Sequence, residues 1–425
     1  MQYPKLLIVA NQCLSKQTSN GRTLRNFLTG WPKEHLAQFC TQLEKPDYDV
    51  CDNYYCVTDS EALNAFIGRK RKKLSSFTKE KSDSLPHSST KKHKRNAITM
   101  MVRDHIWNSN RWKSKQFDNW VSNFNPQVVL LQAGDSRFMF NIARKLAIKY
   151  NASLIIYNSE GYYFKNFDYF RSKGLSHYLY PLFHKLFQHE FAKTIKLAKK
   201  SIYICDALKD DYDAEFHLPS ETIYTATEVQ SREQLSTSGS FIVSYLGNLG
   251  VGRHKGLIDI AEALQKISPS LFLDVYGKIP NDAVKKDFEN SSGIHYKGFI
   301  SYSEVIDVMH KSDLLVHCES FDDFYRTDLK YAFSTKIADS LASGTPFLLY
   351  APKEFAISKY LNKNKAAFVV SEKEKLTSVI NQIKEDFSFR TQYVNSTISL
   401  VKRKHDLNQN ALEFQKTIIE SIEAL

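Results

Sequence analysis

The chain has 425 residues, of which 58 are Lys or Arg and 46 are Asp or Glu, giving a formal net charge of +12. Its 42% apolar and 13% aromatic residues exclude global disorder, and its length suits two domains of ordinary size. The excess charge is local, because residues 69–95 hold eleven Lys or Arg and two acidic residues, leaving +3 on the other 398 residues. We expect this basic segment to be a mobile surface loop.

The N-terminal apolar run, Leu6–Ala10, is too short for the core of a signal peptide. The sequence contains no run of 18 apolar residues, the length needed for a helix to cross a membrane. The six cysteines form no C-x-x-C pair and have no zinc-like spacing, which favours free thiols in a reducing compartment over a disulfide framework. We therefore expect a cytoplasmic protein.

In the first half, short apolar runs alternate with amphipathic stretches of helix length, a pattern typical of α/β folds with parallel sheets. The predicted strands are Leu6–Ala10, Tyr54–Thr58, Val128–Gln132, Ser153–Tyr157 and Ser201–Cys205. A helix is predicted over Asp135–Tyr150, where apolar residues recur on one face.

Residues 175–200 also show helical spacing, with Pro181 placed to kink or restart the helix. The predicted apolar face holds Leu175, Leu179, Leu182, Phe183, Leu186, Phe187, Phe191, Ile195 and Ala198, and the opposite face holds His184, Lys185, His189, Lys193, Lys196 and Lys200. Such a stripe is more often a core-packing face, but with the basic segment 69–95 it also fits an anionic membrane surface. We expect no nucleic-acid partner, because Phe77 is the one aromatic residue in the basic segment and no nucleic-acid-binding motif occurs.

The second half repeats the α/β pattern after a polar linker, Val229–Gly239. Its predicted strands are Phe241–Leu246, Leu271–Tyr276, Ile294–Tyr296, Asp313–His317, Pro346–Tyr350 and Ala367–Val370, and its predicted helices are Gly256–Lys266, Tyr302–His310, Lys336–Ala342 and Glu372–Lys384. The predicted fold class is α/β, with two Rossmann-like doubly wound parallel-sheet domains, 1–228 and 229–405, facing across a cleft. A C-terminal helix, 406–425, is expected to pack back on the first domain. Ligands bind such sheets at the carboxyl ends of the strands.

The first motif is the strand-to-helix turn of residues 245–256, which reads YLGNLGVGRHKG. Glycines let backbone amides approach a bound group, a helix N-terminus favours anions, and Arg253 and Lys255 can neutralise a diphosphate. An ordinary tight turn would carry the same glycines, and the spacing does not match a P-loop. The two cations favour phosphate binding.

The second motif lies within residues 316–346. Glu319 closely follows a predicted buried strand, Ser334-Thr335-Lys336 is a natural helix start, and Gly344 and Pro346 end that helix and open the next strand. A carboxylate at the end of a strand, facing a helix N-terminus with a lysine, can hold a polyhydroxylated ligand together with its phosphate. Alternatively, Glu319 caps a loop and Lys336 is solvated.

Together the two motifs resemble the sugar-nucleotide domain of retaining glycosyltransferases with the GT-B fold, specifically the large family 4, which includes members acting on capsule or exopolysaccharide. Lys255-Gly256 matches the Lys-Gly of the element that grips the donor diphosphate, Glu319 matches the first acid of the Glu-x7-Glu element, and residues 339–346 match its end.

The sequence departs from that family in three ways. Gly247-Asn248 stands where the family has Gly-Arg, and Asp339 stands where it has a second Glu. Between Glu319 and Asp339 lie 19 residues instead of seven, because a segment containing Arg326 and Lys330 is inserted.

The resemblance implies transfer of a hexose-type sugar, with retention, from a nucleotide-diphosphate sugar such as a UDP-sugar to a glycan or polyprenyl-linked acceptor, in cell-surface polysaccharide or glycoconjugate synthesis at the inner face of the membrane. It implies a donor site of Gly247, Asn248, Arg253, Lys255, Gly277, Glu319, Thr335, Lys336 and Asp339. The implied catalytic residues are Glu319, Lys255 and Glu160, and the implied acceptor-side residues are Asn20, Gly21 and Arg22.

Cations and helix amides around Arg253, Lys255 and Lys336 would stabilise the leaving diphosphate, so we expect no required metal or other cofactor. Two Asp-x-Asp matches, 47–49 and 211–213, lie in the first half and are predicted to be solvated loop acids. A different class of function stays open, because Asn248 and the stretched acid spacing also fit a catalytically silent GT-B protein that binds and regulates another glycosyltransferase.

Overall fold

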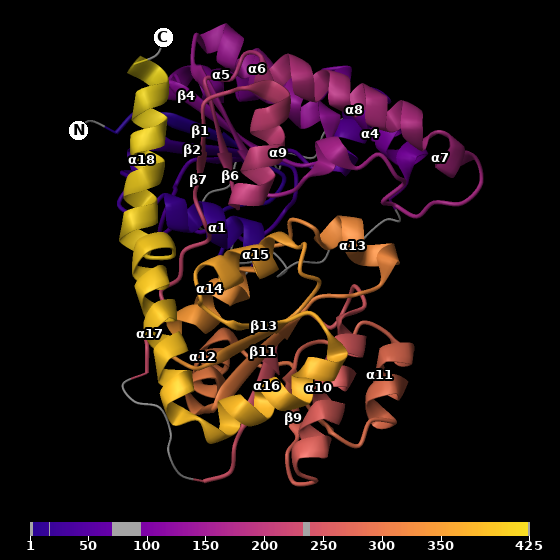
Figure 1. Cartoon of the computed structure of the whole chain (residues 1–425). Coiled ribbons are helices and arrows are strands. Elements are labelled where there is room, and N and C mark those ends of the chain that lie inside the picture. The colour runs from indigo at the N-terminus through magenta and orange to yellow at the C-terminus, as the bar shows by residue number, and fades with distance from the viewer. Residues whose placement is uncertain (1–2, 17, 70–94, 233–238, 424–425) are drawn as a thin grey trace. The chain divides into compact units, whose positions relative to one another are not determined.

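The computed structural model describes residues 3–16, 18–69, 95–232 and 239–423 (Figure 1). Most of the predicted basic loop, residues 70–94, lies outside the described residues. The chain divides into two compact units, Met1–Tyr224 with Asn410–Leu425, and Thr225–Gln409. The sequence-based borders, after residues 228 and 405, lie a few residues from these.

The first unit is built on a seven-stranded parallel sheet with the order β3-β2-β1-β4-β5-β6-β7. Its strands are β1 (Leu6–Val9), β2 (Leu36–Cys40), β3 (Tyr54–Cys56), β4 (Val128–Ala133), β5 (Ser153–Asn158), β6 (Lys200–Tyr203) and β7 (Ser220–Thr222). Five coincide with predicted strands, whereas β2 and β7 were not predicted. The polar Gln38 interrupts the apolar pattern of β2, yet it is fully buried because its amide binds the loop after β1, accepting from Leu14 N at 2.8 Å and donating to Gln12 O at 3.0 Å.

Helices cover both faces of this sheet. They are α1 (Ser19–Phe27), α2 (Asp59–Phe66), α4 (Ala97–Asn108), α5 (Lys115–Phe124), α6 (Arg137–Tyr150), α7 (Leu175–Tyr178), α8 (Tyr180–Ile195), α9 (Asp206–Phe216) and α18 (Leu407–Glu423), with short 3-10 turns η1 (Lys33–His35) and η2 (Tyr162–Phe164). The helix predicted over 135–150 is α6. Asn151 ends it in the left-handed conformation, with φ 48°.

The second unit is built on a six-stranded parallel sheet with the order β10-β9-β8-β11-β12-β13. The strands are β8 (Val243–Leu246), β9 (Leu273–Tyr276), β10 (Ile294–Gly298), β11 (Leu314–Cys318), β12 (Phe347–Tyr350) and β13 (Phe368–Val370), each overlapping a predicted strand. The helices are α10 (Arg253–Ile267), α11 (Asp282–Glu289), α12 (Tyr302–Lys311), α13 (Asp323–Leu329), α14 (Thr335–Ala342), α15 (Ala356–Lys363), α16 (Lys373–Glu385) and α17 (Phe387–Lys404). The two sheets confirm the predicted pair of doubly wound parallel-sheet domains.

The strand order places a topological switch point in each sheet. In the second unit β8 leads outward to β9 and β10, and the chain then returns to place β11 on the other side of β8. The loops that follow β8 and β11 therefore emerge side by side at the carboxyl edge of the sheet, the usual position of a ligand site in this architecture.

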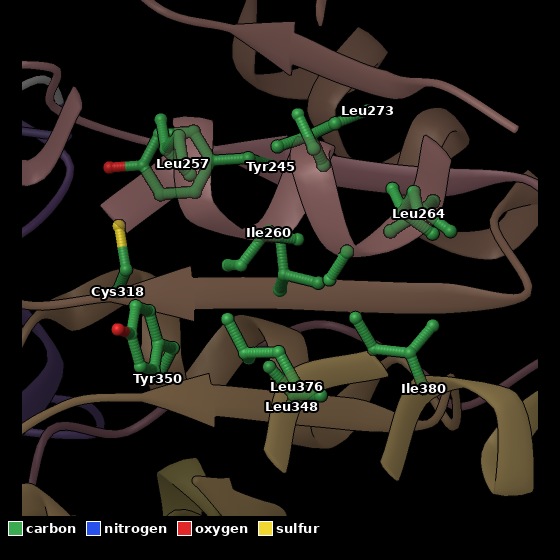
Figure 2. Close-up of a cluster of buried hydrophobic side chains, with 14 of the residues drawn as sticks. Tyr245, Leu257, Ile260, Leu264, Leu273, Cys318, Leu348, Tyr350, Leu376 and Ile380 are labelled. Atoms are coloured by element: carbon green, nitrogen blue, oxygen red, sulfur yellow. The ribbon is translucent and has the colours of Figure 1, made fainter. Parts of the chain in front are cut away.

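Packing in the core of the second unit fixes α10 on the face of the sheet, with its N-terminus at this switch point. Figure 2 shows Leu257, Ile260 and Leu264 of α10 facing the sheet, with Leu376 and Ile380 of α16 on the same layer. All five are fully buried, and burial of each side chain contributes roughly 1.5–3 kcal/mol. A Cβ atom at Gly256 would lie 3.2 Å from the Cβ of Cys318, so glycine lets the first turn of α10 approach the end of β11 closely.

The C-terminal helix α18 completes the core of the first unit. Phe414 is fully buried, and its ring stacks on that of Phe27 with the centroids 5.3 Å apart. Two hydrogen bonds fix the helix along its length, from Asn410 Nδ2 to Tyr224 O at 2.7 Å and from Ser153 Oγ to Ser421 O at 3.0 Å. The last residues of the chain are therefore part of the first folding unit.

We predict that Phe414→Ala destabilises the first unit by about 3–5 kcal/mol, because it removes a buried ring and leaves a cavity beside Phe27. The measurement is the urea midpoint of the first unit's transition. Leu412→Ala on the same helix is the control, since Leu412 is 57% exposed and its truncation should change the free energy of unfolding by less than about 0.5 kcal/mol. Equal effects of the two changes would contradict this role of α18.

His405 makes the stability of the second unit depend on pH. It is fully buried, its Nδ1–H donates to Thr225 O at 2.8 Å, and its Nε2 accepts from the Tyr360 hydroxyl at 2.9 Å. Burial lowers the pKa of His405 to about 4. The unfolded imidazole binds a proton near pH 6.5, so the stability is present above that pH and lost as the pH falls towards 4.

We therefore predict that the second unit loses about 2 kcal/mol between pH 7 and pH 5 through this residue. His405→Gln, which can still donate and accept, should be less sensitive to acid by that amount. Urea titrations of both proteins at the two pH values measure the difference. The same acid sensitivity in both proteins would rule out His405 as its source.

Candidate functional site

The turn between β8 and α10 has a strained backbone. Val251 and Gly252 are consecutive left-handed residues, with φ 53° and 76°, a conformation that costs a β-branched residue energy. A Cβ atom at Gly252 would lie 2.5 Å from Ser320 Oγ, so the turn is pressed against the loop that follows β11. Strain of this kind is concentrated at binding sites, and here it aims the N-terminus of α10 at the switch point.

Asn248, which stands where the resembling family 4 enzymes have arginine, shapes this turn. Its Oδ1 accepts from Gly250 N at 2.9 Å, and its carbonyl accepts from the buried Tyr245 hydroxyl at 2.8 Å. The Asn248 amide therefore serves the conformation of the turn, and the residue brings no positive charge to the site.

Two of the predicted donor-site glycines lie in contact at the ends of adjacent strands. A Cβ atom at Gly277 would lie 2.2 Å from Gly247 O, closer than any side chain could come. Gly277 N also donates to Gly298 O at 2.9 Å, which links the loop ends of β9 and β10. The structure therefore brings Gly247 and Gly277 into close backbone contact, with Gly277 buried and Gly247 partly exposed.

Arg253 and Glu319 form a buried ion pair at the centre of the site. Arg253 Nε donates to Glu319 Oε2 at 2.9 Å and Nη2 to Oε1 at 2.8 Å, while His317 Nε2 lies 3.0 Å from the same Oε1. Glu319 is 0% exposed and Arg253 only 8% exposed. The pair joins the first turn of α10 to the end of β11.

The electrostatics fix the protonation of this cluster. Burial would raise the pKa of Glu319, but the charge of Arg253 and the hydrogen bond from His317 hold that pKa below its usual value. Burial lowers the pKa of His317 and outweighs the attraction of Glu319, with Arg253 and Lys336 repelling a proton as well. The cluster at neutral pH is thus a carboxylate between a guanidinium and a neutral imidazole that donates through Nε2.

The other predicted cations lie at the rim of the cluster. Lys255 is exposed, and its ammonium group is 2.9 Å from Asp322 Oδ2, which raises the pKa of Lys255. Thr335 is the first residue of α14, whose capping residue Ser334 accepts from Lys336 N at 3.4 Å. The N-termini of α10 and α14 therefore each carry a lysine, Lys255 and Lys336, at the positive end of a helix dipole.

Asp339 lies inside the domain. It is 1% exposed, and its Oδ1 accepts from Thr227 Oγ1 at 2.7 Å.

The inserted segment forms the helix α13, in which Arg326 Nε donates to Glu354 Oε1 at 2.6 Å. Lys330, next to this helix, donates to the Tyr331 hydroxyl at 2.8 Å.

Three residues of the site, His317, Ser320 and Asp322, were not predicted from the sequence. His317 could have been found, because positions two apart on a strand share a face and Glu319 lies two residues later. The contacts of Ser320 with Gly252 and of Asp322 with Lys255 are long-range, and no local pattern signals them.

The remaining predicted residues belong to the first unit. Gly21 lies in the first turn of α1, where a Cβ atom would be 2.6 Å from Cys13 O, and Asn20 beside it is exposed. Arg22 is partly buried. Glu160 follows β5, with its carboxylate 3.8 Å from Lys165 Nζ. These residues lie at the carboxyl edge of the first sheet, after β1 and β5.

The prediction that the Asp-x-Asp acids are solvated loop residues was wrong in part. The Asp47 side chain is only 7% exposed, because Arg25 Nε donates to it at 2.8 Å. Asp211 and Asp213 lie in the helix α9, where Asp213 pairs with Lys209 at 2.7 Å.

Within residues 3–16, 18–69, 95–232 and 239–423 there is no group of three His, Cys, Asp or Glu side chains arranged to hold a metal, and no helix long and apolar enough to cross a membrane.

We predict that removing either partner of the buried ion pair alone destabilises the second unit more than removing both charges together. Glu319→Gln alone leaves Arg253 buried without a counter-ion, and Arg253→Met alone leaves the carboxylate, so each should cost about 3–5 kcal/mol. The double variant keeps an acceptor for His317 and buries no unpaired charge, so it should be more stable than either single variant. Urea unfolding of the second unit measures the cycle, and strictly additive losses would contradict it.

Residues 227–399 match the family model described as "Glycosyl transferases group 1". No curated protein matches the sequence. Among solved structures, Anabaena Alr3699/HepE in complex with UDP is similar with a TM-score of 0.61 and 11% identity, covering 99% of this chain and 100% of that one. The same protein has also been solved with UDP-glucose.

Two further structures agree over nearly the whole chain. Sucrose-phosphate synthase from Thermosynechococcus elongatus is similar with a TM-score of 0.60 and 12% identity, covering 99% of this chain and 100% of that one. A glycosyltransferase from Rickettsia africae is similar with a TM-score of 0.58 and 13% identity, covering 99% of each chain. The two doubly wound units therefore have the GT-B fold, and the second unit carries the sequence pattern of the group 1 glycosyl transferases.

Proposed function

We propose that the protein is a retaining glycosyltransferase of the family 4 type, which moves a hexose from a UDP-sugar to an acceptor hydroxyl. The observation that carries this proposal is the arrangement at the switch point of the second unit. There the contact between Gly247 and Gly277, two helix N-termini and the Arg253–Glu319 pair lie in the region that matches the glycosyl transferase model.

The proposed donor site holds the diphosphate at the N-termini of α10 and α14. Lys255 and Lys336 would face its oxygens, and Arg253 can add a donor, since Nη1 makes no hydrogen bond within the described part of the chain. As the anomeric bond breaks, negative charge grows on the leaving diphosphate, and these preorganised groups stabilise it. We propose that they replace a metal ion in this role and that no cofactor is required.

Gly247, which follows β8 and is partly exposed, is proposed to let the nucleotide approach the backbone closely, and the buried Gly277 packs against it. The proposal of UDP is supported by the complexes of Alr3699/HepE with UDP and UDP-glucose. Asp339 was expected to bind the ribose, and its bond to Thr227 inside the domain makes it a weaker candidate than the glycines.

Glu319 is proposed to orient the donor sugar and to hold Arg253 in place. Each carboxylate oxygen has two lone pairs, so Glu319 can serve Arg253 and His317 and still accept from a sugar hydroxyl. Because Glu319 is 0% exposed, that contact requires the loop after β11 to rearrange when the donor binds.

The acceptor is proposed to be a glycan or polyprenyl-linked hydroxyl in cell-surface polysaccharide synthesis, with the enzyme on the cytoplasmic face of the membrane. The proposal rests on the resemblance to capsule and exopolysaccharide enzymes. Asn20, Gly21 and Arg22 are proposed to contact the acceptor, with Glu160 assisting the chemistry from the loop after β5.

A second candidate is a catalytically silent GT-B protein that binds and regulates another glycosyltransferase. Two observations favour it: Asn248 supplies no charge, and Glu319 already neutralises the buried cation Arg253. Such a protein would keep the fold and the ion pair but would bind no sugar nucleotide.

The decisive experiment is a screen of common sugar nucleotides for binding by calorimetry and for donor hydrolysis or transfer. We expect at least one UDP-sugar to bind and turn over, and Lys255→Ala to lower kcat/KM by about 10²-fold, since it removes a cation that faces the leaving group. NMR of the product then gives the anomeric configuration.

Lys266→Ala is the matched control, because Lys266 is an exposed lysine at the other end of the same helix and should not affect turnover. The absence of both binding and turnover for every donor would sink the transferase proposal and favour the silent protein. Unchanged kinetics in Lys255→Ala would show that the donor site is assigned wrongly.

A further inference from the structure

The segment from α7 through α8 forms one nearly continuous helical rod on the first unit. α7 ends at Tyr178 and α8 begins at Tyr180, and Leu179 between them is in the right-handed helical region, with φ −86° and ψ −6°. Pro181 lies in the first turn of α8, so it restarts the helix without the clash of an interior proline.

One side of this rod packs into the domain, as expected for an apolar stripe that forms a core-packing face. The buried side chains include Phe183, Phe187 and Phe191, and Phe140 of α6 contacts the last two at centroid distances of 5.5 and 5.4 Å. His184 is on this buried side, with Nε2 3.1 Å from Tyr162 O, so its predicted place on the cationic face was wrong.

Leu175 and Leu182 were predicted for the buried face and are instead exposed. The exposed fractions are 67% for Leu175, 79% for Tyr178 and 50% for Leu182. At about 100° per residue these three positions fall within about 60° of arc, on the side away from the phenylalanines. They form an apolar patch on the outer side of the rod, at its N-terminal end.

The same face becomes cationic further along α8. Lys185, Lys193 and Lys196 are all exposed and extend the line of the apolar patch within about 80° of arc, with the exposed His189 between them. Residues 171–200 hold seven Lys or Arg and one acidic residue, a net charge of +6. That acid, Glu190, is bound by Arg144 Nη2 at 2.5 Å, so it does not offset the row.

We propose that this face is a docking surface for an anionic lipid bilayer. The apolar patch of Leu175, Tyr178 and Leu182 would insert below the headgroups, and the cation row of Lys185, Lys193 and Lys196 would lie against the lipid phosphates. Charge complementarity selects this occupant, because a row of cations ending in an apolar tip matches the layered chemistry of a bilayer surface.

The surface does not depend on the proposed sugar transfer, since none of its residues belongs to the donor site. The surface adds no residue to the proposed donor site in the second unit, but it would bring the protein to a lipid-linked substrate. Vesicle binding without any sugar donor therefore tests it separately from the transferase proposal.

The test is flotation of the full chain with phosphatidylcholine vesicles, alone or with about a third phosphatidylglycerol. We expect binding to the anionic vesicles only. The variant Leu175→Ser/Tyr178→Ser/Leu182→Ser should weaken it by about tenfold or more, and so should Lys185→Ser/Lys193→Ser/Lys196→Ser. The second loss should shrink at high salt, because screening already weakens the wild type there.

The matched controls lie on α18, where Leu412→Ser and Lys416→Ser change an exposed leucine and an exposed lysine of the same unit and should leave binding unchanged. Wild-type affinity in both triple variants would overturn the proposal and would assign any binding to residues 70–94. A dimer that dissociates in the apolar variant would overturn it too, by making the patch a contact between copies. Circular dichroism of each variant confirms that α8 still folds.

Discussion

The buried ion pair between Arg253 and Glu319 is the constraint on which the candidate site depends. It joins residues 66 positions apart by two hydrogen bonds, and it does so where β8 and β11 lie side by side. Removing both charges from water is costly, so the pair persists only because the geometry is bidentate and His317 satisfies a further lone pair.

The backbone around the pair is equally constrained. The left-handed Val251, the contact of Gly252 with Ser320 and the contact of Gly277 with Gly247 leave almost no freedom for substitution. Together they bring two helix N-termini to one edge of the sheet. In the proposed donor site, helix dipoles and amides would provide much of the anion binding, in place of the arginine that the resembling family 4 enzymes have where this chain has Asn248.

The first unit shows how surface and core share one helix. In α8 the phenylalanines pack into the domain. The opposite, exposed face of the rod formed by α7 and α8 is apolar at its N-terminal end and carries lysines along the rest. The sequence pattern by itself grouped Leu175 and Leu182 with the phenylalanines, because a wide apolar stripe has no visible border. Contacts with α4, α6 and α9 set that border, since only side chains that reach these helices are buried.

The sequence by itself determined the two doubly wound sheets and the order of motifs along them, because strand and helix periods are local and the Gly-rich turn and the Ser-Thr-Lys helix start are short signals. It missed β2, where the buried Gln38 is satisfied by a distant loop. Only the tertiary structure decided that Glu319 holds Arg253, that Asn248 serves its own turn and that Asp339 is internal. Those facts depend on partners far apart in the chain, and the partner of a buried charge is fixed by the folding of the whole domain.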